Sequence, residues 1–292
     1  MLSPVIVRKY ALRLLYAMFE NGDSPESFDY ASFWELAQES ERERFAKARA
    51  KSVLHCMRTQ PDAHRLVELR IAAALEGTRG DLTAASLREQ LEGYLSRSAA
   101  LGSALKALSY SLNDKRRDGA GQLDLCCADL CALAATLVEM GETLSTLFAD
   151  RPDYRLLLEP VAVVLRRRKA DLSCCASLRT PELLKDDAEY ASLAESCEKL
   201  RALPHETEAY VRDLLRHRSR YDEKIAAALE HYTPERVDTV DRCILYLALY
   251  ELLVHGLKVQ IVVAEATALA HEYSGRKSAP FVHGIISAVA NA

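Results

Sequence analysis

Apolar residues recur along the chain with the spacing of an α-helix. One stripe in the first twenty residues follows the i, i+3, i+4 pattern and consists of Val7, Tyr10, Ala11, Leu14, Leu15 and Met18. The stripe stops at Asn21 and Gly22, a pair typical of a helix C-terminus. Arg8, Lys9 and Arg13 lie off the stripe, so we expect them to be available on the outer face of this helix.

The same periodicity predicts helices over most of the remaining chain. In the central part they are expected at residues 30–58, 63–75, 82–112, 123–148, 154–169 and 181–203. In the last third they are expected at residues 206–216, 221–231, 238–254, 260–273 and 281–290. The β-branched runs are short and continue into helix-forming residues, so the pattern predicts an all-α fold.

Composition narrows the class of protein without identifying it. The 292 residues are 49% hydrophobic and 27% charged, which favours a packed core over disorder. The net charge of -4 gives no general nucleic-acid signal, so any RNA contact must come from a local patch. The run of four cations at residues 166–169 is interpreted as a solvated helix end rather than such a patch.

The chain shows no signal peptide and no uncharged apolar run long enough for a membrane span, so we expect a cytoplasmic protein with no membrane contact. Its eight cysteines are then expected to be reduced core residues. Cys127 and Cys131 share a helical face, but these apolar stretches are more typical of core packing than of zinc knuckles. Phosphate-binding glycine loops and nucleophile elbows are also lacking. The sequence therefore predicts no metal, no cofactor and no enzyme activity.

Five blocks of sequence resemble the NusB family of bacterial transcription antitermination factors, in the order in which that family has them. They are RKYALRLLY at residues 8–16, YVRDLL at 210–215, DRCILYLALYELL at 241–253, VVAEATALA at 262–270 and SAPFVHGII at 278–286. The resemblance covers residues 1–22 and 204–292. It implies a NusB-type helical bundle interrupted by a large helical insertion of unknown role at residues 23–203. In that bundle the face formed by Val282, Ile285, Ile286 and Val289 is expected to seal the core.

The resemblance also implies a function in binding. Members of the family pair with ribosomal protein S10, bind single-stranded boxA RNA and support processive transcription of ribosomal RNA operons as part of the elongation complex. The RNA-binding positions that match are in the first helix and in the turn before the last helix: Arg8, Lys9, Arg13, Arg276, Lys277, Ser278 and Phe281. Ser278 is expected to cap the last helix there. The positions that match the protein-partner surface are Tyr16, Glu235 and Asp241.

Two departures from the family pattern keep a second function open. Residues 3–7 are not basic where the family often carries several arginines, and His283 and Ala264 stand where it has asparagine. Residues 1–22 and 204–292 together hold as many basic as acidic residues, so the net charge of -4 lies in residues 23–203. The alternative is therefore a helical protein-binding adaptor that keeps the fold but binds RNA weakly or not at all.

Overall fold

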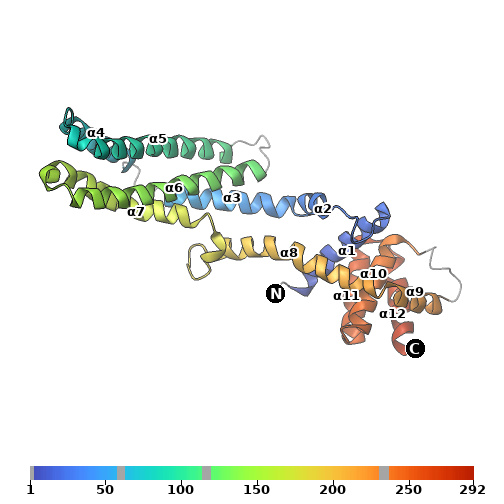
Figure 1. The fold of residues 1–292 in the computed structure, drawn as a ribbon. Helices are drawn as coiled ribbons and strands as arrows, with labels where there is room; N and C mark the ends of the chain where they lie inside the picture. The colour runs from blue at the N-terminus through green and yellow to red at the C-terminus, as the bar shows by residue number, and fades with distance from the viewer. Residues whose placement is uncertain (1–2, 58–62, 114–119, 230–236) are drawn as a thin grey trace. The chain divides into compact units, whose positions relative to one another are not determined.

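The computed structural model describes residues 3–57, 63–113, 120–229 and 237–292, and every regular element in that part of the chain is a helix (Figure 1). The all-α prediction is therefore confirmed. Contacts divide the chain into two compact units: unit 1 is Met1–Gln38 with Lys199–Ala292, and unit 2 is Glu39–Glu198. The boundaries expected from the resemblance, after residue 22 and before residue 204, remain a prediction about the domains.

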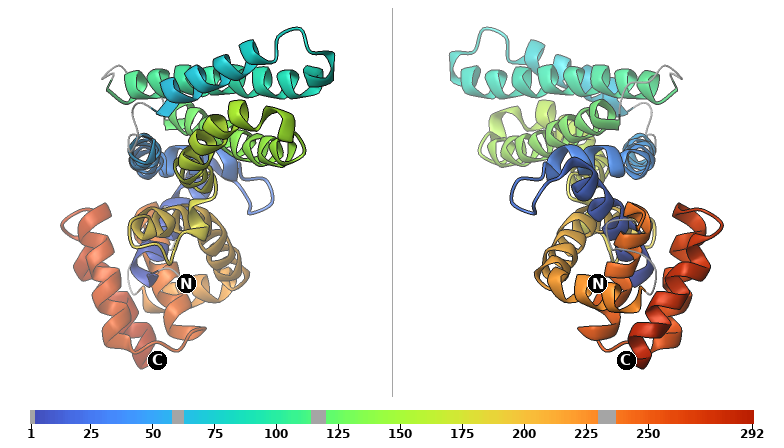
Figure 2. Two further views of the ribbon diagram at one scale, coloured as in Figure 1. Left: turned by 90° about the vertical axis from the view of Figure 1, so that its left-hand side faces the viewer. Right: turned by 90° about the vertical axis from the view of Figure 1, so that its right-hand side faces the viewer.

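Unit 1 is built around one central helix. Its helices are α1 (Pro4–Asn21), α2 (Tyr30–Ala37), the later part of α8 (Ala191–Arg216), α9 (Arg218–Ala228), α10 (Thr239–Leu253), α11 (Val259–Tyr273) and α12 (Ser278–Asn291). Residues 243–250 of α10 are all buried, because this stretch is apolar around its whole circumference. Helices α1, α9, α11 and α12 pack around it, and α11 and α12 lie side by side (Figure 2).

The last helix closes this core as the sequence predicts. Val282, Ile285, Ile286 and Val289 are all buried in α12. They belong to the same apolar cluster as the buried face of α1. The first and last helices of the chain therefore contribute to one core.

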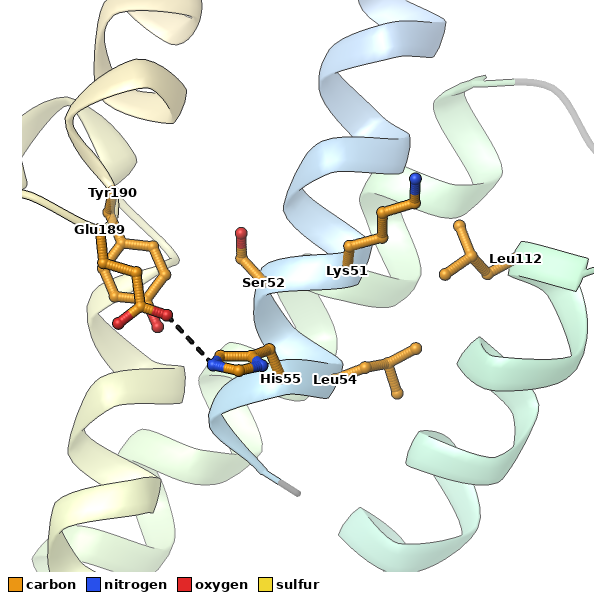
Figure 3. Close-up of a pocket in the computed structure, with 7 residues that line it drawn as sticks. All are labelled: Lys51, Ser52, Leu54, His55, Leu112, Glu189 and Tyr190. Carbon is orange, nitrogen blue, oxygen red and sulfur yellow. Dashed lines mark ion pairs between the residues drawn. The ribbon is translucent and has the colours of Figure 1, made fainter. Parts of the chain in front are cut away.

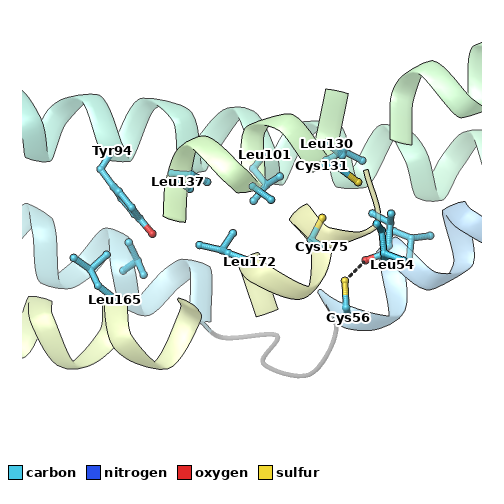
Figure 4. Packing of buried hydrophobic residues seen from close by; sticks show 14 of the residues in the cluster. Leu54, Cys56, Tyr94, Leu101, Leu130, Cys131, Leu137, Leu165, Leu172 and Cys175 are labelled. Atoms are coloured by element: carbon cyan, nitrogen blue, oxygen red, sulfur yellow. Dashed lines mark hydrogen bonds between the residues drawn. The ribbon is translucent and has the colours of Figure 1, made fainter. Parts of the chain in front are cut away.

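Unit 2 has its own core around α6 (Ala120–Ala149). The other helices are α3 (Glu39–Cys56), α4 (Ala63–Gly77), α5 (Ala85–Asn113), α7 (Arg155–Ser177) and the start of α8, with short 3-10 turns η1 (Leu82–Ala84), η2 (Pro152–Tyr154) and η3 (Pro181–Leu183). Helix α6 packs against α3, α5 and α7, and α4 packs against α5 and α7. Leucines from these helices interdigitate with several cysteines and with Tyr94 (Figure 4).

Two predicted helix boundaries are wrong for a shared reason. The helix expected at residues 30–58 is divided at Gln38 into α2 and α3, whereas the break expected after residue 203 does not exist, because α8 continues through Pro204. Proline has no N–H, so the carbonyl of Leu200 loses its usual partner four residues later. The side-chain amide of Gln38 donates to that carbonyl at 3.3 Å, and the backbone of Gln38 leaves the helical conformation.

The cation run at residues 166–169 lies in the middle of α7 rather than at a helix end, so that interpretation is also wrong. Arg168 is buried and donates to the hydroxyl of Ser98 at 2.6 Å, while Arg166, Arg167 and Lys169 are exposed. The helix extends beyond the charged run because Leu172 and Cys175 continue its buried face.

Candidate functional site

Helix α1 presents two opposite faces. It begins at Pro4, whose missing N–H costs nothing in the first turn, and ends at Gly22 with φ 73°, a left-handed conformation that glycine adopts easily. Its apolar stripe is buried against α10, and Arg13 and Tyr16 are exposed on the opposite side. This helix therefore exposes a cation and an aromatic ring.

Arg8 lies in the interior of unit 1 rather than on that exposed face. Its Nε is 2.5 Å from Oε1 of Glu251 on α10, and one terminal nitrogen is 2.9 Å from Oε2 of Glu265 on α11. The hydroxyl of Tyr210 donates to the same Glu251 oxygen at 3.1 Å. Burial tends to lower the pKa of Arg8, but the hydrogen bond and charge of Glu251 raise it above its ordinary value. The arginine that the resemblance assigns to RNA thus connects three helices.

Lys9 and Arg13 come together with the end of α11. The ammonium of Lys9 is 2.7 Å from Oε2 of Glu272, and its hydrogen bond lowers the pKa of that carboxyl. The guanidinium carbon of Arg13 lies 5.4 Å from the centre of the Tyr10 ring. Both cations also act electrostatically on Tyr273, whose pKa is raised chiefly by burial. One edge of unit 1 therefore combines two cations with a tyrosine that is 36% exposed.

The turn between α11 and α12 carries the second pair of predicted cations. Arg276 and Lys277 are both exposed there, only three and four residues after Tyr273. The hydroxyls of Ser274, at 2.8 Å, and of Ser278 donate to Oδ1 of Asp241. A buried carboxylate at the start of α10 therefore fixes both ends of this basic turn.

Ser278 and Phe281 occupy different places from those expected. Ser278 is the first residue of α12 and is buried, and its hydroxyl makes no capping bond, so the predicted cap is wrong. Phe281 lies in the first turn of α12, partly buried against the core of unit 1. Tyr273 is more accessible than Phe281. The sequence pattern does not single it out, because a tyrosine at a helix end is a common feature.

The predicted protein-partner residues that the structure describes differ in exposure. Tyr16 is 40% exposed on α1, and Asp241 is buried by its two serine partners. Glu235 lies outside the described residues. Of the two that the structure describes, Tyr16 has the accessible side chain.

Other sites have a weaker chemical basis. A pocket of about 450 Å³ in unit 2 is lined by Lys51, Ser52, Leu54, His55, Leu112, Glu189 and Tyr190 (Figure 3). Across it, Nε2 of His55 is 3.3 Å from Oε1 of Glu189. Over the described ranges, no group of three or more His, Cys, Asp or Glu side chains is placed to hold a metal ion. None of the described helices has the length and apolar character needed to cross a lipid bilayer.

The comparisons with known proteins agree on one family. The model of the NusB family matches residues 176–291. The transcription antitermination protein NusB of Acidothermus cellulolyticus is 35% identical over 131 residues, which is 44% of this chain and 87% of that protein. Its counterpart from Solibacter usitatus is 38% identical over 88 residues, or 29% of this chain and 60% of that protein. The one from Anaeromyxobacter dehalogenans is 37% identical over 84 residues, or 29% and 59%.

The chain therefore spans most of the Acidothermus protein but only about three fifths of the other two. No solved structure gives a match. The family match includes the end of α7 and the whole of α8 to α12, and most of unit 2 lies outside it.

Proposed function

The chain belongs to the NusB family, and from that premise we propose that it is a transcription antitermination factor. In this role it binds boxA-type nascent RNA together with ribosomal protein S10 and supports processive transcription of ribosomal RNA operons. It acts by binding within the transcription elongation complex, and we propose no catalytic step.

The observation that carries the RNA-binding part of the proposal is a set of accessible cations and one accessible aromatic ring in unit 1. We call it the basic edge and define it as Lys9, Arg13, Tyr273, Arg276 and Lys277. Single-stranded RNA is held by cations on its phosphates and by aromatic faces beneath its bases. The basic edge supplies four cations and, in Tyr273, an accessible ring.

The buried contacts support this edge indirectly. Asp241 fixes the turn that carries Arg276 and Lys277, so these cations are held in place before RNA arrives. Arg8 ties α1 to α10 and α11, which supports the helix that carries Lys9 and Arg13. In this proposal Arg8 positions the basic edge and does not itself contact phosphate.

Tyr16 is the proposed anchor for S10. It lies on the exposed side of α1, one turn beyond Arg13. A half-exposed tyrosine contributes apolar area and a hydroxyl to a protein interface at little entropic cost. Replacing it with alanine is expected to weaken S10 binding without changing RNA binding by the chain alone.

The proposal is tested by electrophoretic mobility shift of boxA RNA with the full chain, with and without S10. We expect binding that S10 strengthens and that scrambled RNA does not reproduce. Arg13→Ala and Lys277→Ala should each weaken it, whereas Arg220→Ala, an exposed cation on α9, is the matched control. No shift with either RNA, even at low salt and with S10 present, would overturn the proposal.

The second candidate function is a helical adaptor that binds protein partners and has weak or no RNA binding. It is favoured by the burial of Arg8 and by the exposed apolar residues Val5 and Ile6 in the first turn of α1. If the chain binds S10 but RNA does not join the complex in a mixture of all three, that result would support the adaptor. A measurable boxA affinity that Lys277→Ala weakens would exclude it.

A further inference from the structure

Four thiols from three helices meet in the core of unit 2. Cys56 is the last residue of α3, Cys131 lies on α6, and Cys174 and Cys175 lie on α7. The thiols of Cys174 and Cys175 interact with that of Cys56, and the thiol of Cys175 also interacts with that of Cys131. Cys131, Cys175 and Cys56 follow one another across the helices in Figure 4. Apolar packing alone does not require sulfur atoms to face one another.

One end of this row is close to solvent. Cys131 and Cys175 are fully buried, whereas Cys174 is half-buried and its sulfur lies 3.3 Å from the hydroxyl of Tyr190. Tyr190 also lines the pocket of about 450 Å³ (Figure 3). Two further lining residues, Leu54 and His55, directly precede Cys56. The pocket therefore lies beside Tyr190, which contacts Cys174, and beside the residues that directly precede Cys56.

The two thiols of this pair differ in acidity. Hydrogen bonds from Cys175 and Cys174 lower the pKa of Cys56. Burial raises the pKa of Cys174 to about 11. Because the thiolate is the nucleophile in thiol chemistry, Cys56 is the attacking sulfur and Cys174 the thiol that responds.

We infer that Cys56 and Cys174 form a reversible disulfide when a small hydroperoxide enters this pocket. The Cys56 thiolate attacks one peroxide oxygen and breaks the O–O bond, which leaves Cys56 as a sulfenic acid and releases the other oxygen as water or an alcohol after protonation. Cys174 then loses its proton and attacks the sulfenic sulfur. The S–S bond forms, the S–O bond breaks, and the hydroxide leaves as water.

The electrons balance in this sequence. The two thiols give up two electrons and two protons, and the hydroperoxide is reduced to water plus water or an alcohol. A cellular dithiol reverses the reaction by thiol–disulfide exchange. The covalent bond ties the end of α3 to α7 within unit 2, so the thermal midpoint of the oxidised protein is expected to rise.

The experiment treats the reduced full chain with stoichiometric hydrogen peroxide, blocks remaining thiols with N-ethylmaleimide and maps the peptides by mass spectrometry. The expected result is one cross-linked peptide pair containing Cys56 and Cys174, lost on reduction with dithiothreitol. Absence of this cross-linked peptide pair overturns the inference. That holds if no thiol is consumed, and also if a different disulfide forms, such as one between Cys131 and Cys175. This readout needs no variant.

Two variants sharpen the assignment. In Cys174→Ser the reaction should stop at the Cys56 sulfenic acid, which dimedone traps, and the cross-link should disappear. Cys126→Ser is the matched control, because Cys126 is also a half-buried thiol of unit 2 but contacts Gln122 on its own helix. Cross-linking in Cys174→Ser, or its loss in Cys126→Ser, contradicts the assignment.

Discussion

Arg8 holds three helices of unit 1 together through a single guanidinium. The side chains of Arg8 and Glu251 are 8% and 7% exposed, so their ion pair is almost completely removed from water. A buried pair of this kind gains little over an apolar pair of the same shape, because both charges lose their hydration. Removing one partner is different, since the other charge is then left in the core without compensation.

Replacing Glu251 with leucine is expected to destabilise the protein by about 3 kcal/mol, because Arg8 keeps only Glu265 as a carboxylate partner. Adding Arg8→Met to this variant should recover a large part of the loss. Urea unfolding of the single and double variants measures both effects.

The control is Lys9→Met, which removes the exposed ion pair with Glu272 and should change stability little. Equal effects of Glu251→Leu and Lys9→Met would show that the buried position of Arg8 has no energetic consequence.

Asp81 gives a pH-dependent prediction in unit 2. Hydrogen bonds from Tyr154 and Thr83 lower the pKa of this carboxyl from 3.8 to about 2. As the pH falls, the unfolded chain takes up this proton before the folded chain does, so the contribution to stability is complete above 3.8 and is lost as the pH falls towards 2. Carboxyl NMR titration should give a midpoint near 2 for Asp81, and Tyr154→Phe should move it upwards. An unchanged midpoint in Tyr154→Phe would contradict this cause.

At the scale of elements, a proline and a glutamine that are far apart in sequence determine two helix boundaries. Helix α8 passes through Pro204 without losing a carbonyl partner, because the amide of Gln38 replaces the missing N–H. Gln38 is almost completely buried, and its backbone ends α2. The boundary between α2 and α3 and the continuity of α8 are therefore coupled.

A double-mutant cycle measures this coupling. Gln38→Leu leaves the carbonyl of Leu200 without its donor and should cost about 1 kcal/mol. In a Pro204→Ala background the new N–H satisfies the same carbonyl, so Gln38→Leu should cost much less there. Thermal unfolding of the four proteins gives the coupling energy, and equal costs in both backgrounds would disprove the link.

These examples show which features follow from sequence. Helical periodicity predicts the all-α fold and the buried face of α12, because local spacing determines both. It does not predict that Arg8 finds Glu251, since the two residues are 243 positions apart and arginine is usually exposed. The break at Gln38 and the clamp of Ser274 and Ser278 on Asp241 also depend on contacts across the fold.

The distribution of charge along the chain favours a local RNA site. The segments that resemble the family are neutral in sum, and the acidic excess lies in residues 23–203. A region with a small net negative charge offers no general attraction to a phosphate backbone. The proposed RNA contacts therefore have to come from the four cations of the basic edge, and the exposed cations of α7 in unit 2 should contribute little.

The salt dependence of boxA binding tests this distribution. Each phosphate contact to a single strand contributes about -0.7 to the slope of log K against log salt, so four contacts predict a slope of about -3. Lys277→Ala should reduce the slope by about one contact, whereas the paired substitution Arg166→Ala and Arg167→Ala in α7 should leave it unchanged. Fluorescence anisotropy of labelled RNA over a salt series measures all three proteins. The slope counts the cations that contact phosphate. If the α7 substitutions reduce its magnitude and Lys277→Ala does not, the RNA site lies outside unit 1.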